Sequence, residues 1–153
     1  MKYAKLTALS LFLALSTSWG LAAEAADEAG TIKTTKGSAT VERSGQKLPA
    51  SVGMRVLVSD RVMTGADGTI GITLRDNTLL SAGPNSALDI NKFSFDASTH
   101  VGEIDASIKR GTLSVISGKI AKASPERVTF SAPGMALAVR GTEFVIDAGQ
   151  PPQ

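Results

Sequence analysis

The feature that most constrains this chain is a two-residue alternation of apolar and polar side chains after residue 30. Within residues 69–75, for example, Ile70, Ile72 and Leu74 alternate with small or polar residues. Such alternation places the apolar side chains on one face of a strand, whereas a helix needs a repeat of about 3.6 residues. Similar short runs recur at 112–115, 128–130, 136–140 and 143–146. The pattern therefore predicts an all-β domain.

Turn signals separate these runs, as at residues 44–45, 76–77 and 133–134. Two stretches, 84–90 and 133–139, share a proline, a turn residue, a variable position and then Ala-Leu-x-aliphatic. The Gly-Thr pairs that open several runs are irregularly spaced, which argues against a strict repeat protein. Two architectures stay open: an irregular β-solenoid and a sandwich-like fold. The polar stretch 91–109 is expected to form a projecting hairpin or a long loop.

The first 25 residues have the pattern of a helical secretory signal peptide. Lys2 and Lys5 precede a mostly apolar run at 6–15, and Ala23-Glu24-Ala25 offers the small-x-small sequence that signal peptidase cleaves. An uncleaved membrane anchor is the alternative, but a span needs about 20 largely apolar residues. We therefore expect cleavage near Ala25 and a periplasmic or secreted product that is not embedded in a membrane.

The expected organisation is a signal peptide at 1–25, a short flexible lead at 26–30, one all-β domain at 30–147 and a flexible tail at 148–153. The tail contains Gly149, Pro151 and Pro152, which do not extend a central strand. Because the chain has no cysteine, its hydrophobic core must hold the domain together without disulfides.

Aromatic side chains are scarce beyond residue 25, where only Phe93, Phe95, Phe130 and Phe144 remain. Single-strand nucleic-acid grooves rely on aromatic stacking platforms, and sugar-binding faces use similar ones. The composition therefore argues against a nucleic-acid partner.

Acidic residues predominate between 60 and 105, and basic residues between 109 and 140. One interpretation is two solvated surfaces whose charges offset each other. The other is a patch for an anionic partner. Its candidate residues are Lys109, Arg110, Lys119, Lys122 and Arg127.

Catalytic candidates are few. His100 is the only histidine, so neither an acid–base pair of histidines nor a zinc site with several imidazoles can be formed. Glu103 and Asp105 would share one face of a strand, yet no dense acidic loop and no sugar-stacking aromatic side chain accompanies them. We predict no catalytic residue, no metal site and no cofactor, and hence a protein that is not an enzyme.

Residues Arg140, Gly141 and Thr142 form a candidate structural motif. Gly141 is suited to a positive φ or a bulge between two strands. Arg140 is suited to bidentate bonds with a carboxylate or with neighbouring carbonyl groups that fix strand register. Recognition of an anionic group by Arg140 is the functional alternative.

The order of these motifs resembles the FecR domain of bacterial envelope proteins. The matching pieces lie at 37–43, 60–65, 68–74, 76–79, 84–86, 113–115 and 139–144. The last piece, Val-Arg-Gly-Thr-x-Phe, makes the ordered set specific, and the resemblance spans about residues 30–147. It implies an all-β, solenoid-like periplasmic domain that binds and transmits rather than catalyses. The best-known members also carry a cytoplasmic segment that holds a sigma factor and serve iron-uptake signalling, whereas here the domain follows the predicted signal peptide directly, as in a stand-alone secreted form.

Two functional hypotheses follow. The first is a protein-interaction or sensing module of the cell envelope that uses an exposed strand edge to bind an envelope protein. The alternative is a binding protein for an anionic envelope polymer, either peptidoglycan or lipopolysaccharide, through the basic residues between 109 and 127.

Overall fold

The computed structural model describes residues 27–138 and 141–150, and most of these residues lie in strands. Within these residues, twelve strands form one curled, mostly antiparallel sheet. The all-β class predicted from the alternation is confirmed. The predicted signal peptide at 1–25 and residues 151–153 of the predicted tail lie outside the described residues.

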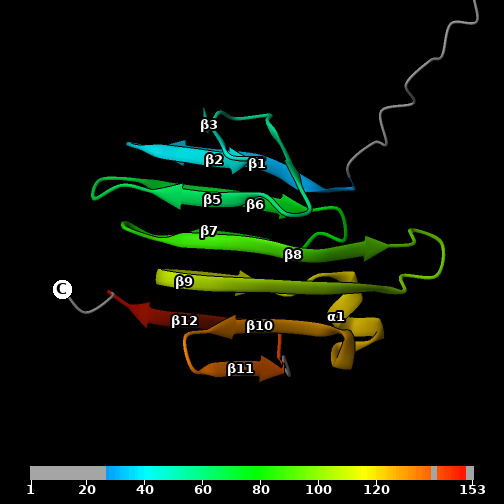
Figure 1. Cartoon of the computed structure of the whole chain (residues 1–153). Helices are drawn as coiled ribbons and strands as arrows, with labels where there is room; N and C mark the ends of the chain where they lie inside the picture. The colour runs from blue at the N-terminus through cyan, green and yellow to red at the C-terminus, as the bar shows by residue number, and fades with distance from the viewer. Residues whose placement is uncertain (1–26, 139–140, 151–153) are drawn as a thin grey trace, which may run out of the picture.

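The strands are stacked in layers from β1 to β12 (Figure 1). Their bounds are β1 Glu28–Lys36, β2 Ala39–Arg43, β3 Gln46–Pro49, β4 Arg55–Leu57, β5 Arg61–Thr64, β6 Thr69–Leu74, β7 Leu79–Ala82, β8 Ala87–Phe95, β9 Gly102–Ile116, β10 Val128–Ala132, β11 Met135–Ala138 and β12 Glu143–Gly149. A short helix, α1 (Lys119–Ala123), and a 3-10 turn, η1 (Pro125–Arg127), connect β9 to β10.

The sheet has two halves that face each other across the core. The A half contains, in spatial order, β4, β1, β6, β7, the second part of β9 and then β12. The B half contains β3, β2, β5, β8, the first part of β9, β10 and β11. Strand β9 belongs to both halves, because its residues 102–110 pair with β8 and its residues 113–116 pair with β7.

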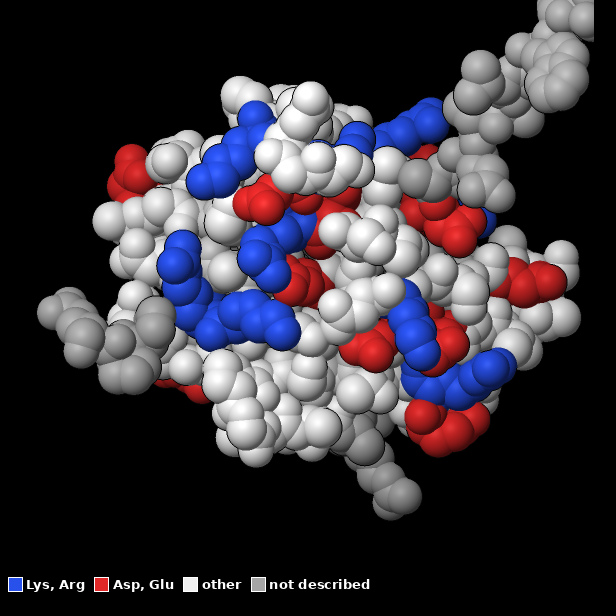
Figure 2. Space-filling view, viewed as in Figure 1, with Lys and Arg blue, Asp and Glu red and all other residues white. Residues whose placement is uncertain are grey.

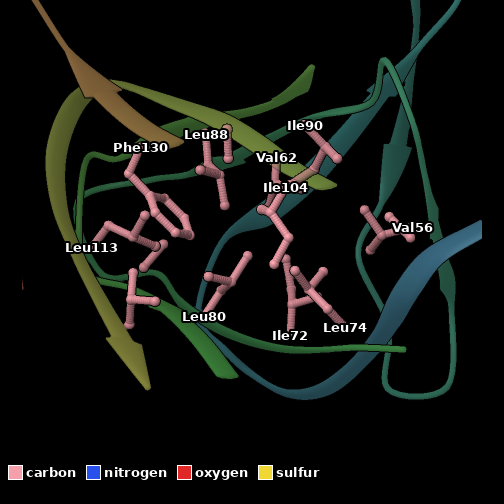
Figure 3. Close-up of a cluster of buried hydrophobic side chains, with 14 of the residues drawn as sticks. Val56, Val62, Ile72, Leu74, Leu80, Leu88, Ile90, Ile104, Leu113 and Phe130 are labelled. Carbon is pink, nitrogen blue, oxygen red and sulfur yellow. The ribbon is translucent and has the colours of Figure 1, made fainter. Parts of the chain in front are cut away.

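The core is filled by the inward face of each half. Strand β6 shows the alternation clearly: Ile70, Ile72 and Leu74 are buried, and the residues between them face outward. Each fully buried aliphatic side chain contributes about 1.5–3 kcal/mol. Figure 3 shows side chains from both halves meeting in this core: Val62, Ile72, Leu80, Leu88, Ile104, Leu113 and Phe130.

Some boundaries differ from those expected from sequence. Strand β1 begins inside the expected flexible lead, because Ala29 is fully buried in the core. Strand β12 continues into the expected tail as far as Gly149. The polar stretch 91–109 forms the hairpin alternative, in which β8 and β9 pair up to a turn at 96–101.

The strand pairing is that of a curled, sandwich-like sheet. Among the pairs in the described residues, β9 with β10 is parallel and the others are antiparallel. Parallel coils of a regular solenoid are therefore not formed within this part of the chain. Consecutive strands such as β1 and β2, or β5 and β6, nevertheless place one strand in each half and so form one layer of the stack. Stacked layers are a feature of a solenoid and two facing halves are a feature of a sandwich, so the sequence pattern fits both.

Four of the layers, those of β1 and β2, of β5 and β6, of β7 and β8, and of β9, pass from one half to the other at a shared corner. The corner segments are 37–38 between β1 and β2, 65–68 between β5 and β6, 83–86 between β7 and β8, and Gly111 inside β9. Main-chain hydrogen bonds link the segments of neighbouring layers. The N–H of Gly65 donates to the carbonyl oxygen of Ser38 at 2.9 Å, and the N–H of Asn85 donates to that of Gly65 at 2.9 Å.

Two buried hydroxyl groups complete this corner. The Thr64 Oγ1 donates to the carbonyl oxygen of Gly83 at 2.6 Å and accepts from the N–H of Ser86 at 2.9 Å. The Ser86 Oγ accepts from the N–H of Thr112 at 3.1 Å. A buried polar group without a hydrogen-bond partner costs about 1–3 kcal/mol. The bonds made by the Thr64 and Ser86 hydroxyl groups avoid this cost, so both side chains can be buried.

Glycine is required where the layers approach most closely. A Cβ atom at Gly68 would overlap the carbonyl oxygen of Ser38, and one at Gly111 would overlap the side chain of Ser86. Gly111 also has a φ of 80°, which disfavours other residues. The corner thus fixes both the bend of each layer and the distance between layers.

We predict that Gly111→Ala destabilises the domain by about 2–4 kcal/mol, through left-handed strain and overpacking against Ser86. Gly134→Ala is the matched control, because Gly134 has a similar φ of 74° but no atom near its missing Cβ. The control should lose only about 1–2 kcal/mol, from strain alone. Urea unfolding followed by circular dichroism measures both, and equal losses would contradict the close approach at the corner.

Candidate functional site at the β12 edge

The first edge of the A half, at β4, is closed by side chains. Arg43 on β2 donates from Nη2 to the carbonyl oxygen of Arg55 at 2.9 Å. The N–H of Leu57 donates to Asp60 Oδ2 at 2.8 Å, and the carbonyl oxygen of Leu57 accepts from the N–H of Asp60 at 3.1 Å. These main-chain groups of Arg55 and Leu57 lie on the side of β4 that faces away from β1. Because they already have hydrogen-bond partners, they are not free to pair with an added strand.

The same two side chains form a bidentate ion pair. Arg43 donates from Nε to Asp60 Oδ1 at 2.9 Å and from Nη2 to Asp60 Oδ2 at 2.7 Å. The hydrogen bond and the charge of Asp60 raise the pKa of Arg43, against the smaller opposing effect of burial. Asp60 is only 1% exposed, and a carboxylate charge at such a buried site needs hydrogen-bond donors. Three donors, Arg43 Nε, Arg43 Nη2 and the N–H of Leu57, supply them.

The neighbouring edge of the B half, at β3, is short. Strand β3 has four residues and ends at Pro49, which has no N–H to offer. The connection 50–54 then leads to β4, and the N–H of Gly53 donates to the carbonyl oxygen of Ile32 on β1 at 2.8 Å. The beginning of the stack therefore presents little free main chain.

The last edge of the A half, at β12, is different. Strand β12 has seven residues and pairs with β9 on one side, from Glu143 opposite Ile116 to Gly149 opposite Gly111. The N–H of Ser117 donates to the carbonyl oxygen of Thr142 at 2.7 Å, which fixes the phase of this ladder. Within the described residues, no strand pairs with its other side.

The phase of the ladder decides which groups are free. In an antiparallel pair, the main-chain groups of alternate residues point to the same side. Since Thr142 points to β9, so do Phe144 and Ile146, while the N–H and C=O groups of Glu143, Val145 and Asp147 point to the unpaired side. These three residues, which we call the β12 edge, offer hydrogen-bonding groups to an added strand.

Strand β12 is anchored in the core by its inward face. Ile146 is buried at 4% exposure, and the half-buried Phe144 ring lies edge-on to Phe130, with 5.5 Å between ring centroids and 70° between ring planes. Aromatic pairs of this kind contribute about 0.5–1.5 kcal/mol beyond their buried area. The β12 edge is therefore held on a packed strand.

The outer surface of the A half beside this edge carries small polar side chains. Register places Gly71, Ser81, Ser114 and Val145 in one row across β6, β7, β9 and β12. A shallow hollow runs along this row, with Thr34 on its far side. In this row, Val145 is the largest side chain, and the positions beyond it toward β6 carry only serine and glycine.

The predicted basic residues do not form one continuous surface. Lys109 and Arg110 come just before the corner at Gly111, whereas Arg127 precedes the start of β10, level with the beginning of β9. About six strand residues, or roughly 20 Å, separate Lys109 from Arg127 along the B half. On the face seen in Figure 2, acidic and basic side chains lie next to one another over the central part.

Lys119 and Lys122 lie on α1, at the end of β9 away from the corner. The helix is fixed to the turn between β6 and β7 by Asp76, whose carbonyl oxygen accepts from the N–H of Lys119 at 2.8 Å and whose Oδ2 accepts from the N–H of Ile120 at 3.2 Å. Both lysines are exposed, as is Arg127 in η1. The structure thus groups Lys119, Lys122 and Arg127 near one end of the B half.

The candidate motif 140–142 joins β11 to β12. Arg140 lies outside the described residues. Gly141 has a φ of 151°, and its carbonyl oxygen accepts from Ser117 Oγ at 3.0 Å. Together with the bond from Ser117 to the carbonyl of Thr142, this contact sets the start of the β12 ladder.

The titratable candidates are scattered. His100 lies in the exposed turn between β8 and β9, where its ring stacks on Phe95 at 6.2 Å between centroids. Glu103 lies 3.9 Å from Lys92, and Asp105 is half-buried two residues further along β9. Among the described residues, no three His, Cys, Asp or Glu side chains come together as metal ligands.

Sequence reasoning missed both edge features. Arg43 and Asp60 lie 17 residues apart in segments with no shared pattern, so nothing in the sequence signals their pairing. The alternation over 143–147 does indicate a strand, but its place at an edge depends on strand order. The one available signal was its position as the last apolar run before Gly149 and the prolines.

Comparison with known proteins gives one match. A family model described as FecR protein matches residues 60–152, which include β5 to β12 and the whole β12 edge. No curated protein and no solved structure matches the chain. None of the helices in the described residues is long and apolar enough to cross a membrane.

We predict that Asp60→Asn destabilises the domain by about 1–3 kcal/mol, because the charged hydrogen bonds between the buried Asp60 and the partly exposed Arg43 are lost. Asp89→Asn is the control: Asp89 forms a bidentate pair with Arg61 on the exposed outer surface and should cost less than about 1 kcal/mol. Amide hydrogen exchange at Leu57 should also accelerate in Asp60→Asn. Unchanged exchange at Leu57 would show that Asp60 does not close the β4 edge.

Proposed function

The chain belongs to the FecR protein family, and on that premise we propose that it is an exported, non-catalytic interaction module of the bacterial cell envelope. The family is a regulatory one with roles in envelope sensing and signalling. In this proposal the domain binds an envelope protein by adding a strand of that protein to the β12 edge. Export is supported by the signal-peptide pattern at residues 1–25.

The contrast between the two ends of the A half carries this proposal. On β4, the outward carbonyl oxygens of Arg55 and Leu57 and the outward N–H of Leu57 are bonded to Arg43 and Asp60, whereas the outward groups of Glu143, Val145 and Asp147 on β12 have no main-chain partner among the described residues. Exposed edges invite pairing with other chains, and proteins usually protect them. A fold that protects one edge with a partly buried ion pair and leaves the other available is suited to strand addition at the latter.

The main-chain contribution to such a contact is substantial. Each of the three edge residues can exchange two hydrogen bonds with an antiparallel strand, which gives about six bonds. At about 0.5–1.5 kcal/mol net for each bond, the edge supplies several kcal/mol before any side chain takes part. Side chains on the two faces then add specificity.

We predict that Val145→Pro abolishes partner capture while the domain stays folded. The N–H of Val145 points away from β9, so proline removes no bond of the existing ladder, yet it removes a donor and obstructs an added strand. Val145→Thr is the matched control, because it retains both the N–H and a branched side chain. Circular dichroism should show the same fold for all three proteins.

The measurement is affinity capture from a periplasmic extract, with bound proteins identified by mass spectrometry. The expected result is a protein recovered with the wild type and with Val145→Thr and absent with Val145→Pro. Equal recovery with all three proteins, or no specific protein in any growth condition, would falsify strand addition at β12.

A second candidate function is binding of an anionic envelope polymer by Lys119, Lys122 and Arg127, which are exposed near one end of the B half. We expect Lys119→Glu with Lys122→Glu to reduce cosedimentation with purified peptidoglycan, and added salt to do the same. Lys33→Glu with Lys47→Glu, at exposed sites elsewhere, is the charge-matched control. Sedimentation that neither salt nor the α1 substitutions change would exclude this function.

A further inference from the structure

The β12 edge carries a specific charge pattern on its outer face. Glu143, Val145 and Asp147 are all exposed, with Val145 at 68%, and they share the face opposite to the buried Ile146. The edge therefore presents an acidic, an apolar and an acidic side chain at every second residue. Directly opposite residues of an added strand would lie on this same face, with Cβ atoms about 5 Å away.

This pattern opposes pairing between two copies of the chain. In an antiparallel pair centred on Val145, Glu143 would lie opposite Asp147 of the second copy at both ends of the contact. In a parallel pair in register, each acidic residue would lie beside its own counterpart. Like charges directly opposite each other destabilise a strand pair. The edge is available, but the chain itself is a poor partner for it.

The inner face of an added strand would meet apolar surface. Its intermediate residues would continue the layer formed by Phe144, Ile146 and Phe130, next to the half-buried Leu137 of β11. Apolar side chains at these positions would cover the end of the core, at about 25 cal/mol for each Å² removed from water.

We propose that the β12 edge binds, in antiparallel orientation, an extended protein segment with the pattern basic, apolar, apolar, apolar, basic. The two basic side chains lie opposite Glu143 and Asp147, the central apolar one lies opposite Val145, and the other two face the core. This inference rests on the proposed strand addition and adds the chemistry that selects the partner.

The test uses fluorescein-labelled peptides and fluorescence anisotropy with the purified chain. The probe is Ser-Lys-Ile-Val-Ile-Lys-Ser, and its comparison is Ser-Glu-Ile-Val-Ile-Glu-Ser. The chain should bind the lysine peptide about tenfold or more tightly than the glutamate peptide, since two attractive pairs replace two repulsive ones. Methylation of the central valine nitrogen should abolish binding, because that N–H donates to the carbonyl oxygen of Val145.

A charge-reversed edge provides the second arm. Glu143→Lys with Asp147→Lys should reverse the preference, so that the glutamate peptide becomes the tighter ligand. Asp27→Lys with Asp96→Lys is the control, because it makes the same change in net charge at exposed sites just before β1 and in the turn between β8 and β9. A reversal in the control as well would assign the preference to overall charge and overturn the inference.

The outcomes separate this inference from the proposed function. Equal binding of both peptides, lost in Val145→Pro, would overturn the charge selection and leave strand addition in place. Binding of neither peptide would also overturn the inference, and the capture experiment with Val145→Pro would then decide the proposed function by itself.

Discussion

The close approach of main chains at the corner is the contact on which the rest of the structure depends. There, Gly68 packs against the carbonyl group of Ser38 and Gly111 against Ser86, with no room for a Cβ atom. The buried hydroxyl of Thr64 bridges two connections of neighbouring layers. Because the layers of β1 and β2, of β5 and β6, of β7 and β8, and of β9 bend at this corner, each of them contributes to both halves, and the inward faces of the two halves meet in one core without any disulfide.

A stack of layers has an edge strand at each end, and the two edge strands of the A half, β4 and β12, differ in how far their outward main-chain groups are bonded. At the beginning, Arg43 and Asp60 form hydrogen bonds with three of the four outward main-chain groups of Arg55 and Leu57 on β4. At the other end, β12 is fixed to the core through Ile146 and keeps its outward main-chain groups unpaired among the described residues. The same layered construction that stabilises the domain therefore leaves the β12 edge available, and the acidic residues on that edge disfavour its use by a second copy.

The sequence predicts the local structure well because burial alternates in the strands, as in 69–74, whose apolar residues all reach the core. It fails where neighbours come from distant segments. Lys109 and Lys119 are only ten residues apart in the sequence, but Lys109 lies beside the corner and Lys119 lies in α1, beyond the end of β9 that is away from the corner. The shared Ala-Leu pattern at 87–88 and 136–137 gives a buried strand in β8 and an outer strand in β11, because strand order decides burial. For the same reason, the sequence does not indicate that β12 lies at an edge of the sheet.

Residue-resolved amide hydrogen exchange along β12, with and without the lysine peptide, tests the availability of this edge most directly. In the free protein, the amides of Phe144 and Ile146 should exchange slowly, and those of Glu143, Val145 and Asp147 should exchange quickly, because only the first two point to β9. The peptide should slow exchange at the three edge residues. Slow exchange at Val145 in the free protein, or no change when the peptide is bound, would contradict an edge that is free to accept a strand.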